Sequence, residues 1–255
     1  MMKQARVLDF IMEIDERDGL GRKLLKNGIY ELREARTWRA ILRPGATAFD
    51  IGAHWGYYSI QASKIVGEGG CVVAVEPEPM NYGMLCRNLD LNRCSNVKAM
   101  EAAVDGPDLS DYPPGAFLPN AKNSGAGRLL PGPAVYPLLQ TIAVNRLSLL
   151  SLLRLYPKAN IVKCDTQGAE AHIFCADALE ELRRREAKII FEYWPRGLNL
   201  RGSNGKGLLA NFINAGFALF RFDKSGLELL GGRDPLAGAR AGHTNLFARP
   251  REVAP

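Results

Sequence analysis

An acid and two glycines lie close together in the segment Asp50-Ile-Gly-Ala-His-Trp-Gly56, directly after a short apolar run. Gly52 and Gly56 allow the backbone to turn sharply and to approach a ligand closely. The free N–H groups of a following helix would favour a polar ligand at this turn. The spacing is GxxxG rather than the GxGxxG of dinucleotide sites, and Asp50 would repel a pyrophosphate. The segment therefore predicts a loop for a ligand with a cationic amino-acid tail.

A second acid, Glu76, follows the apolar run 71–75 and lies twenty residues after Gly56. A carboxylate at the end of the second strand of such a fold can accept hydrogen bonds from the hydroxyl groups of a ribose. Alone, Glu76 could equally be a strand-end carboxylate that faces water. Together with the glycine loop, its spacing predicts a site for a nucleoside cofactor.

A third polar segment follows the apolar residues 160–164, beginning with Asp165. Because Asp165 ends another predicted parallel strand, we expect it across a crevice from the Asp50 loop. Glu170 lies in the first turn of the next predicted helix, where the helix dipole favours an acid. The sequence leaves open whether Glu170 has only this capping role or takes part in function.

Alternating strands and helices are predicted to position these residues. We expect strands at 46–50, 71–75, 97–104, 160–165, 188–193, 217–222 and 244–249, and helices at 57–66, 79–92, 147–155, 168–185 and 206–215. This alternation is typical of an α/β fold with a doubly wound, mostly parallel sheet, here of seven strands. Apolar residues near helical spacing over 5–42 predict a helical lead-in before the sheet.

The predicted organisation is one domain over residues 1–255, with a helical N-terminal cap at 1–43 and a core at 44–249. Residues 105–140 interrupt the core with seven prolines and five glycines and have no sustained periodicity. We expect an irregular excursion there, with a hairpin. So long an interruption of a compact domain is either a functional lid or disordered.

Composition excludes several classes of protein. The net charge of +6 is spread along the chain. The arginine cluster 183–185 follows two glutamates, so this cluster indicates a solvated helix face rather than a nucleic-acid site. No apolar run approaches the roughly 20 residues of a membrane span, and the start does not resemble a signal peptide. Five cysteines without a CxxC pair argue against a zinc site and a disulfide framework. We expect a cytoplasmic protein with no metal.

The polar segments, taken together, resemble the FkbM-type methyltransferases, which have the class I, Rossmann-like fold and depend on S-adenosylmethionine (SAM). The resemblance rests on seven segments within roughly 44–249: 49–59, 75–79, the pair Asn88 and Asn92, 123–125, 163–170, 191–195 and 244–248. The chain departs from the family at His54-Trp55, where Asn-Ile or a similar pair is usual. It also departs at Asp165-Thr-Gln-Gly168, where Asp-Val-Glu-Gly is common, and at 145–147.

The resemblance implies that SAM is bound and leaves as S-adenosylhomocysteine. The residues expected at the cofactor are Asp50, Gly52, Ala53, His54, Gly56, Tyr57, Tyr58, Glu76, Pro77, Ala102, Ala103, Asn123, Ser124 and Asp165. Asp50 and the two glycines would cradle the amino-acid tail, Glu76 would bind the ribose, and the alanines would border the adenine.

A hydroxyl acceptor must lose its proton during methyl transfer, and His54, Asp165 and Glu192 are the candidates for this role. His54 is of interest because the ordinary pKa of histidine lies near neutrality. It could equally serve only through its backbone in the cofactor loop. Trp55, Gln167 and Trp194 are the residues expected to shape the pocket for the acceptor.

Families of this kind mostly methylate hydroxyl groups of sugars and secondary metabolites, so we expect a small-molecule or glycan acceptor and no nucleic acid or membrane. A homodimer is left open. The alternatives are N-methylation of an amine or guanidine, a nicotinamide-dependent oxidoreductase, which the missing GxGxxG disfavours, and a non-catalytic nucleotide-binding module.

Overall fold

The computed structural model describes residues 1–106, 115–120, 123–130, 140–236 and 242–252. Its centre is an eight-stranded sheet in the order β14-β13-β15-β12-β11-β3-β4-β5. The strands are β3 (Thr47–Ile51), β4 (Cys71–Glu76), β5 (Val97–Glu101), β11 (Ala159–Cys164), β12 (Lys188–Tyr193), β13 (Phe217–Asp223), β14 (Gly226–Leu229) and β15 (Thr244–Pro250). The predicted α/β fold with a mostly parallel sheet is confirmed.

The predicted number of seven strands is wrong because β13 continues into a hairpin with β14. Asp223 is paired with Gly226, so only two residues form the turn, and Asp223 Oδ1 accepts a hydrogen bond from the Ser225 N–H at 2.9 Å. This hairpin adds an edge strand beyond the seven expected.

The strand order reverses beside β3. The chain first forms β3, β4 and β5 outward in one direction, then returns through β11, which pairs with the other side of β3. All five residues of β3 are buried, as expected for a strand with parallel neighbours on both sides. Ligands of doubly wound sheets bind at the carboxyl ends of the strands at such a reversal. The fold therefore locates a ligand site beyond Ile51 and Cys164.

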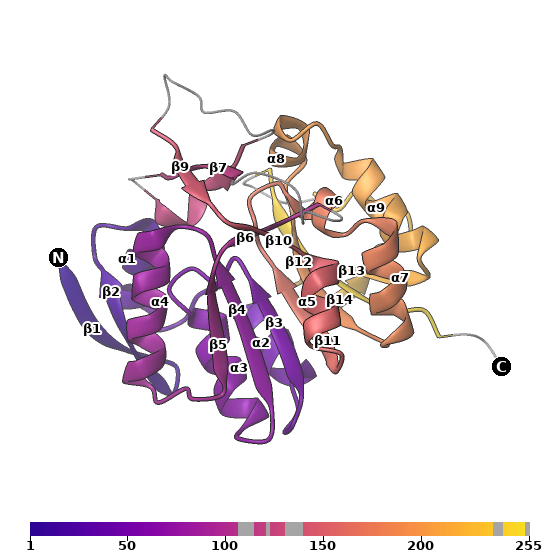
Figure 1. Ribbon diagram of the computed structural model, residues 1–255. Coiled ribbons are helices and arrows are strands. Elements are labelled where there is room, and N and C mark those ends of the chain that lie inside the picture. Colours follow the sequence, from indigo (N-terminus) through magenta and orange to yellow (C-terminus); the bar gives the residue numbers. More distant parts are fainter. Residues whose placement is uncertain (107–114, 121–122, 131–139, 237–241, 253–255) are drawn as a thin grey trace.

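Helices cover both faces of the sheet (Figure 1). The elements α2 (Leu32–Ile41), α3 (Tyr57–Val66) and α4 (Pro79–Leu91) contribute buried residues such as Trp38 and Leu85 to one core. The opposite core contains residues of α5 (Leu149–Leu155), α6 (Glu170–Ile173), α7 (Ala176–Arg184) and α9 (Gly205–Asn214). A further helix, α8 (Pro195–Leu200), follows β12.

The helical lead-in predicted over 5–42 is wrong for its first part, where the chain forms a hairpin of β1 (Met2–Val7) and β2 (Phe10–Asp15). In β2, Phe10, Met12 and Ile14 are buried while Ile11 is exposed, which is the two-residue period of a strand. The asparagines of α4 support this hairpin, because Asn88 Oδ1 accepts the Glu13 N–H at 2.7 Å. The helical prediction is confirmed only for α1 (Gly19–Asn27) and α2.

Two predicted elements are each divided into shorter ones. The helix expected over 168–185 is broken at Phe174, whose buried ring packs against those of Phe191 and Phe212, and continues as α7. The strand expected over 97–104 is divided into β5 and β6 (Ala103–Asp105). β6 leaves the central sheet and pairs in parallel with β10 (Arg146–Ser148).

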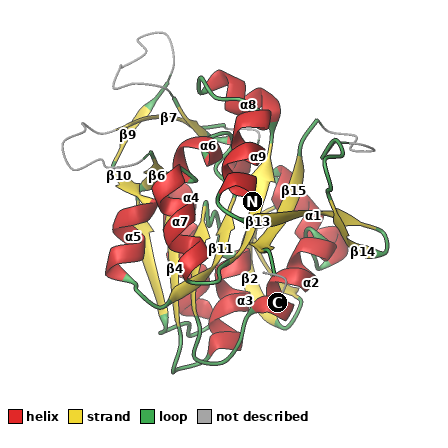
Figure 2. Ribbon diagram, turned by 90° about the vertical axis from the view of Figure 1, so that its right-hand side faces the viewer, coloured by secondary structure: helices red, strands yellow, loops and turns green. Residues whose placement is uncertain are grey.

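Two strands of the proline-rich excursion form a small sheet with a strand directly after it, in the order β8-β7-β9, which lies at the top of the molecule in Figure 2. Its strands are β7 (Gly115–Leu118), β8 (Arg128–Leu129) and β9 (Ile142–Val144), and the short helix η1 (Ser124–Ala126) precedes β8. The predicted hairpin is present as the antiparallel pair of β7 and β8. The rest of the excursion, 107–114, 121–122 and 131–139, lies outside the described residues.

Candidate active site

A cavity of about 680 Å³ lies at the carboxyl ends of β3, β4, β11 and β12. Sixteen of the predicted site residues line it: Gly52, Ala53, His54, Trp55, Tyr57, Tyr58, Glu76, Pro77, Ala102, Ala103, Asn123, Ser124, Asp165, Gln167, Glu192 and Trp194. This volume lies within the range of ordinary small-molecule and cofactor sites. Asp50 and Gly56 do not line it.

The loop after β3 is held in place by its neighbours on both sides. The N–H groups of Gly52 and Ala53 donate to the Val75 carbonyl oxygen at 2.9 and 3.0 Å. Gly52 has a φ of +81°, and a Cβ added to it would lie 2.0 Å from the Asp165 carbonyl oxygen. Gly52 is therefore required because the loop crosses the backbone at the end of β11, and not only because a ligand comes close.

The structure corrects the predicted roles of Asp50 and Gly56. The Asp50 carboxylate is buried below the loop, where it accepts a hydrogen bond of 2.5 Å from the Ser59 hydroxyl of α3. A Cβ on Gly56 would lie 2.8 Å from Leu85 Cδ1, so this glycine serves the packing of α3 against α4. Both residues shape the loop from beneath, whereas the sequence predicted that they would contact the ligand.

Glu76 lies at the end of β4 with both carboxylate oxygens engaged. Oε2 accepts the His54 N–H at 2.8 Å, and Oε1 accepts the Glu78 N–H at 3.0 Å. Burial raises the pKa of Glu76 to about 7, although these hydrogen bonds oppose the effect. A carboxylate has about four acceptor positions, so two remain for donors of a ligand.

His54 lies beside Glu76 in the loop after β3 and has a left-handed φ of +51°. Its Nε2 lies 2.7 Å from the Ser124 hydroxyl oxygen, and its ring stacks on Trp55 at 4.5 Å. Burial lowers the pKa of His54 to about 4, so the ring is neutral at pH 7. Its Nδ1 is buried without a hydrogen-bond partner.

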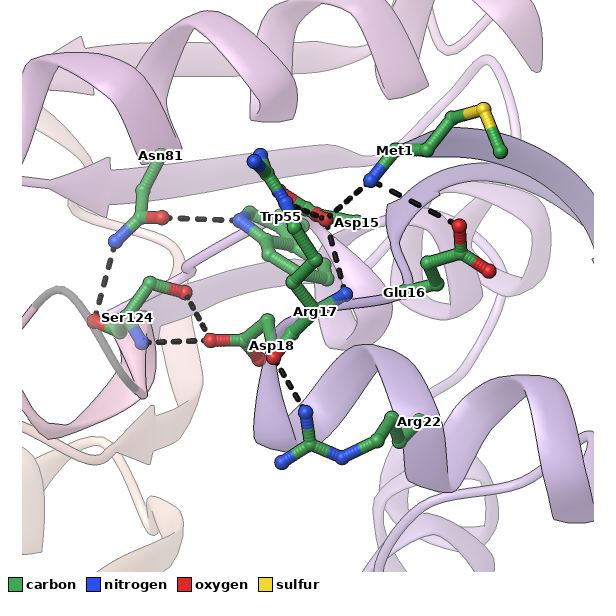
Figure 3. A network of polar contacts seen from close by, with 9 residues as sticks. All are labelled: Met1, Asp15, Glu16, Arg17, Asp18, Arg22, Trp55, Asn81 and Ser124. Atoms are coloured by element: carbon green, nitrogen blue, oxygen red, sulfur yellow. Dashed lines mark hydrogen bonds and ion pairs between the residues drawn. The ribbon is translucent and has the colours of Figure 1, made fainter.

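A clasp of Asp18, Ser124 and Asn81 closes this end of the cavity (Figure 3). Asp18 Oδ2 accepts from both the N–H and the hydroxyl of Ser124, at 2.7 and 3.0 Å, while its Oδ1 caps α1. Because the Ser124 hydroxyl donates to Asp18, its oxygen can accept the Nε2 proton of His54, which leaves Nδ1 as an acceptor. Asn81 connects the clasp to Trp55, whose indole N–H donates to Asn81 Oδ1 at 2.9 Å.

The other end of the cavity is lined by a row of polar and charged side chains in contact with one another, which we call the acidic ring: Glu31, Tyr58, Lys163, Asp165, Gln167, Glu192 and Asn245. Lys163 Nζ lies 3.3 Å from Asp165 Oδ2. The Gln167 amide donates to Asp165 Oδ1 at 2.9 Å and to Glu192 Oε1 at 3.1 Å. Although burial opposes it, the carboxylates Asp165, Glu31 and Asp50 raise the pKa of Lys163 above its ordinary value.

Glu31 joins two further members of the acidic ring. Its Oε1 accepts the Asn245 amide N–H at 3.1 Å, and its Oε2 accepts the Tyr58 hydroxyl at 2.7 Å. Lys163 Nζ lies 4.4 Å above the Tyr58 ring. Burial raises the pKa of Glu31 and, more strongly, that of Glu192, to which the negative charge of Asp165 also contributes. Three carboxylates thus surround a single lysine.

Four important residues were missed by the sequence analysis: Asp18, Glu31, Lys163 and Asn245. Asp18 precedes a helix and could have been found as an N-cap, and Lys163 is a charge inside a buried strand. For Glu31 no sequence signal points to the cavity. Glu170, which was left open, is outside the cavity and accepts the N–H groups of Thr166 and Gly168. Its role is to cap that loop.

Within the described ranges, no group of three or more His, Cys, Asp or Glu side chains is arranged to hold a metal ion. All five cysteines have free thiols. Among the helices that the structure describes, none is long and apolar enough to cross a membrane.

A family model for the methyltransferase FkbM domain matches residues 50–217, which is more than half of the chain. The chain belongs to the FkbM methyltransferase family. This confirms the resemblance noted in the sequence and supports SAM-dependent methyl transfer as its activity. The family match begins after Glu31 and ends before Asn245, so these two cavity-lining residues come from outside the matched segment.

Solved structures with a similar arrangement include several methyltransferases. A precorrin-6y C5,15-methyltransferase from Geobacter metallireducens is 14% identical, with 87% of each chain covered and a TM-score of 0.47. TYW2 from M. jannaschii, in complex with AdoMet, is also 14% identical, with 99% of this chain and 87% of that chain covered and a TM-score of 0.47. A SAM-dependent methyltransferase from Aquifex aeolicus has 14% identity, 86% and 89% coverage and a TM-score of 0.42. No curated protein matches the sequence.

Proposed function

We propose that this FkbM-family protein transfers the methyl group of SAM to a hydroxyl group of a sugar or a related small molecule. The observation that carries the proposal is Glu192, a buried carboxylate at the cavity whose Oε2 has no hydrogen-bond partner and whose pKa is raised. A general base must lie within hydrogen-bond reach of the proton that it removes, and this unpaired oxygen is available to receive one. Glu192 is therefore the base that we assign to the acceptor hydroxyl.

The cofactor fits the end of the cavity formed by the loop after β3. Glu76 has acceptor positions left for ribose hydroxyls, Ala102 and Ala103 leave room for the adenine, and His54 Nδ1 offers a buried acceptor for the ammonium group of the amino-acid tail. SAM supplies an electrophilic methyl group on a sulfonium. The chain's own contribution is to align the acceptor and to receive its proton.

His54 and Asp165 are less suited to be the base. The pKa of His54 is lowered to about 4 by burial, so it binds a proton only weakly at pH 7. Asp165 has one oxygen against Lys163 and the other against Gln167. In the proposed step a carbon–oxygen bond forms on the acceptor, the carbon–sulfur bond breaks, and the hydroxyl proton moves to Glu192 Oε2, with S-adenosylhomocysteine released.

N-methylation is the second candidate, favoured by the excess of carboxylates over lysine in the acidic ring, which would suit a cationic acceptor. Incubation of the protein with SAM and a panel of hydroxylated and amino acceptors, followed by mass spectrometry and NMR of the product, distinguishes the two. A methyl group on oxygen supports the proposal, and a methyl group on nitrogen contradicts it. SAM binding without any turnover would instead support a non-catalytic module.

The Glu192→Gln variant tests the assigned base. We expect its turnover to fall by about 100-fold, within the range for loss of general-base catalysis, while SAM affinity is unchanged. Turnover equal to that of the unmodified protein would remove Glu192 from this role. A cytoplasmic location, the absence of a nucleic-acid partner and a homodimer belong to the same proposal and await fractionation and sizing of the native protein.

A further inference from the structure

Two acceptor oxygens of the acidic ring have no donor among the residues that the structure describes. Glu192 Oε2 and Asn245 Oδ1 are both buried without a hydrogen-bond partner, in side chains of residues that are 5% and 8% exposed. Both residues line the cavity. A buried acceptor left unpaired costs about 1–3 kcal/mol, so a ligand that supplies donors to both atoms would be favoured.

The two residues lie side by side on the sheet. Glu192 of β12 is directly opposite Asn245 of β15 in the antiparallel register. Side chains at opposite positions of such a pair project to the same face with Cβ atoms about 4.5–5.5 Å apart. Their free oxygens are thus positioned for two donors of one molecule rather than for two separate ligands.

The orientation of Asn245 is determined by Glu31. The Asn245 amide nitrogen faces the Glu31 carboxylate and donates to it at 3.1 Å, as an ionised carboxylate requires of its partner. Glu31 is itself held by the Tyr58 hydroxyl. The atom that Asn245 leaves available is therefore its oxygen, and its missing partner is a donor.

We infer that Asn245 is a specificity-determining residue that binds a second hydroxyl of the acceptor, on the carbon next to the one that carries the methylated oxygen. The inference rests on the proposed function, in which Glu192 takes the proton of the first hydroxyl. The acceptor class is then a vicinal diol. Glu31 acts as a positioning residue, because both of its oxygens are engaged, one by the Asn245 amide and the other by the Tyr58 hydroxyl.

Equilibrium binding tests the inference without need of turnover. The probes are methyl pyranosides and myo-inositol, each compared with analogues that lack one hydroxyl of a vicinal pair, added to the protein with S-adenosylhomocysteine. The fluorescence of Trp55 and Trp194, which line the cavity, provides the signal. We expect at least one diol to bind about tenfold more tightly than its monodeoxy analogue, the loss expected for one unpaired buried acceptor.

In the Asn245→Ala variant this tenfold preference should disappear, while the affinity of the monodeoxy analogue and of S-adenosylhomocysteine stays the same. Asn199→Ala, at an exposed position of α8, is the matched control and should keep the preference. The Glu31→Gln variant, which can still accept from the Asn245 amide, should keep most of it. Should Asn245→Ala fail to fold, Asn245→Ser gives the same comparison with a smaller change.

Four results would each overturn the inference: equal binding of the diol and its monodeoxy analogue, tighter binding of an amino alcohol, no binding of any probe below 50 mM, or a preference that survives in Asn245→Ala. These outcomes are separate from failure of the proposed function. The latter is decided by whether a methyl group reaches oxygen, whereas the diol preference is measured with a cofactor product that cannot transfer one.

Discussion

The two ends of the cavity are built in different ways. The end assigned to the cofactor is formed largely by turns that follow consecutive strands, with Gly52 to Trp55 after β3 and Glu76 after β4. The acidic ring instead joins Glu31, Lys163, Glu192 and Asn245, which come from four elements spread over more than two hundred residues. A local motif forms the end assigned to the cofactor, whereas the acidic ring depends on distant segments, two of which lie outside the family match.

The energetics of the two ends differ as well. At the cofactor end the loop is held by backbone hydrogen bonds and a glycine, whereas the ring holds three carboxylates around one buried ammonium group. A buried charge is stable only when its partners remain, so the ring should be sensitive to the loss of a single group. The comparison predicts that the largest stability effects come from the acidic ring.

Removal of the buried lysine should have the largest effect. We expect Lys163→Met to lower the free energy of unfolding by about 3–5 kcal/mol, because Asp165 and its neighbours lose the only lysine of the ring. Urea denaturation measures the change. Lys158→Met, at an exposed position before β11, is the control and should change stability by less than about 0.5 kcal/mol. A loss below about 1 kcal/mol for Lys163→Met would show that the ring carries little charge.

Substitution of the loop glycine should have a somewhat smaller effect. In Gly52→Ala the new Cβ would meet the Asp165 carbonyl oxygen and the residue would keep a positive φ, so we expect a loss of about 3 kcal/mol. Gly28→Ala is a matched control, since Gly28 also has a positive φ but nothing lies within 4 Å of its Cβ. It should lose only about 1 kcal/mol. Thermal and urea unfolding of both variants would show whether the close approach of Gly52 to the Asp165 backbone limits the stability of the variant.

The smallest effect should be on cofactor binding at Glu76. We expect Glu76→Gln to weaken SAM binding by roughly 10- to 100-fold, the value of hydrogen bonds to a charged group. The pKa of Glu76 is raised to about 7 by burial, and only its ionised form accepts from both hydroxyls fully. The SAM affinity of the unmodified protein should therefore rise as the pH increases through about 7, and this dependence should vanish in the variant.

The stability of the ligand-free protein should follow the opposite trend. Because the folded pKa of Glu76 is raised, its contribution to stability is fully present below the unfolded pKa and is lost as the pH rises through about 7. Glu76→Gln should then be more stable than the unmodified protein above that pH. Calorimetry from pH 5.5 to 8.5 would show whether the stability of Glu76→Gln rises above that of the unmodified protein as the pH increases. Exposed Glu68→Gln is the control and should show no such change.

Much of the cofactor end could be predicted from the sequence because its signals are local. The glycine loop, Glu76 and Asp165 each follow an apolar run of strand length, and parallel strands bring their carboxyl ends to one edge. The same local reasoning assigned Asp50 and Gly56 to the ligand, whereas their contacts are with Ser59 and Leu85. Spacing identifies a loop, but it does not determine which side of the loop a side chain occupies.

The first fifteen residues show a second limit. Leu8, Ile11, Met12 and Ile14 fit a helical spacing loosely, yet the chain forms a hairpin whose buried residues alternate. The free backbone N–H groups at the edge of that hairpin donate to Asn88 of α4 and to Asn92 directly after it, more than seventy residues away. Local periodicity could not distinguish the two structures, because the deciding partners are in a distant helix.

Sequence alone thus determined the alternation of strands and helices in the core, the family and the glycine loop after the first core strand, since these depend on neighbouring residues and on fixed spacings. Tertiary structure decided that Glu31 and Asn245 meet, that Lys163 is surrounded by carboxylates, and that Asp18 clasps Ser124 above His54. The physical reason is that a pKa or a hydrogen bond depends on what lies within a few ångströms, and only folding brings residues 31, 163 and 245 within that range.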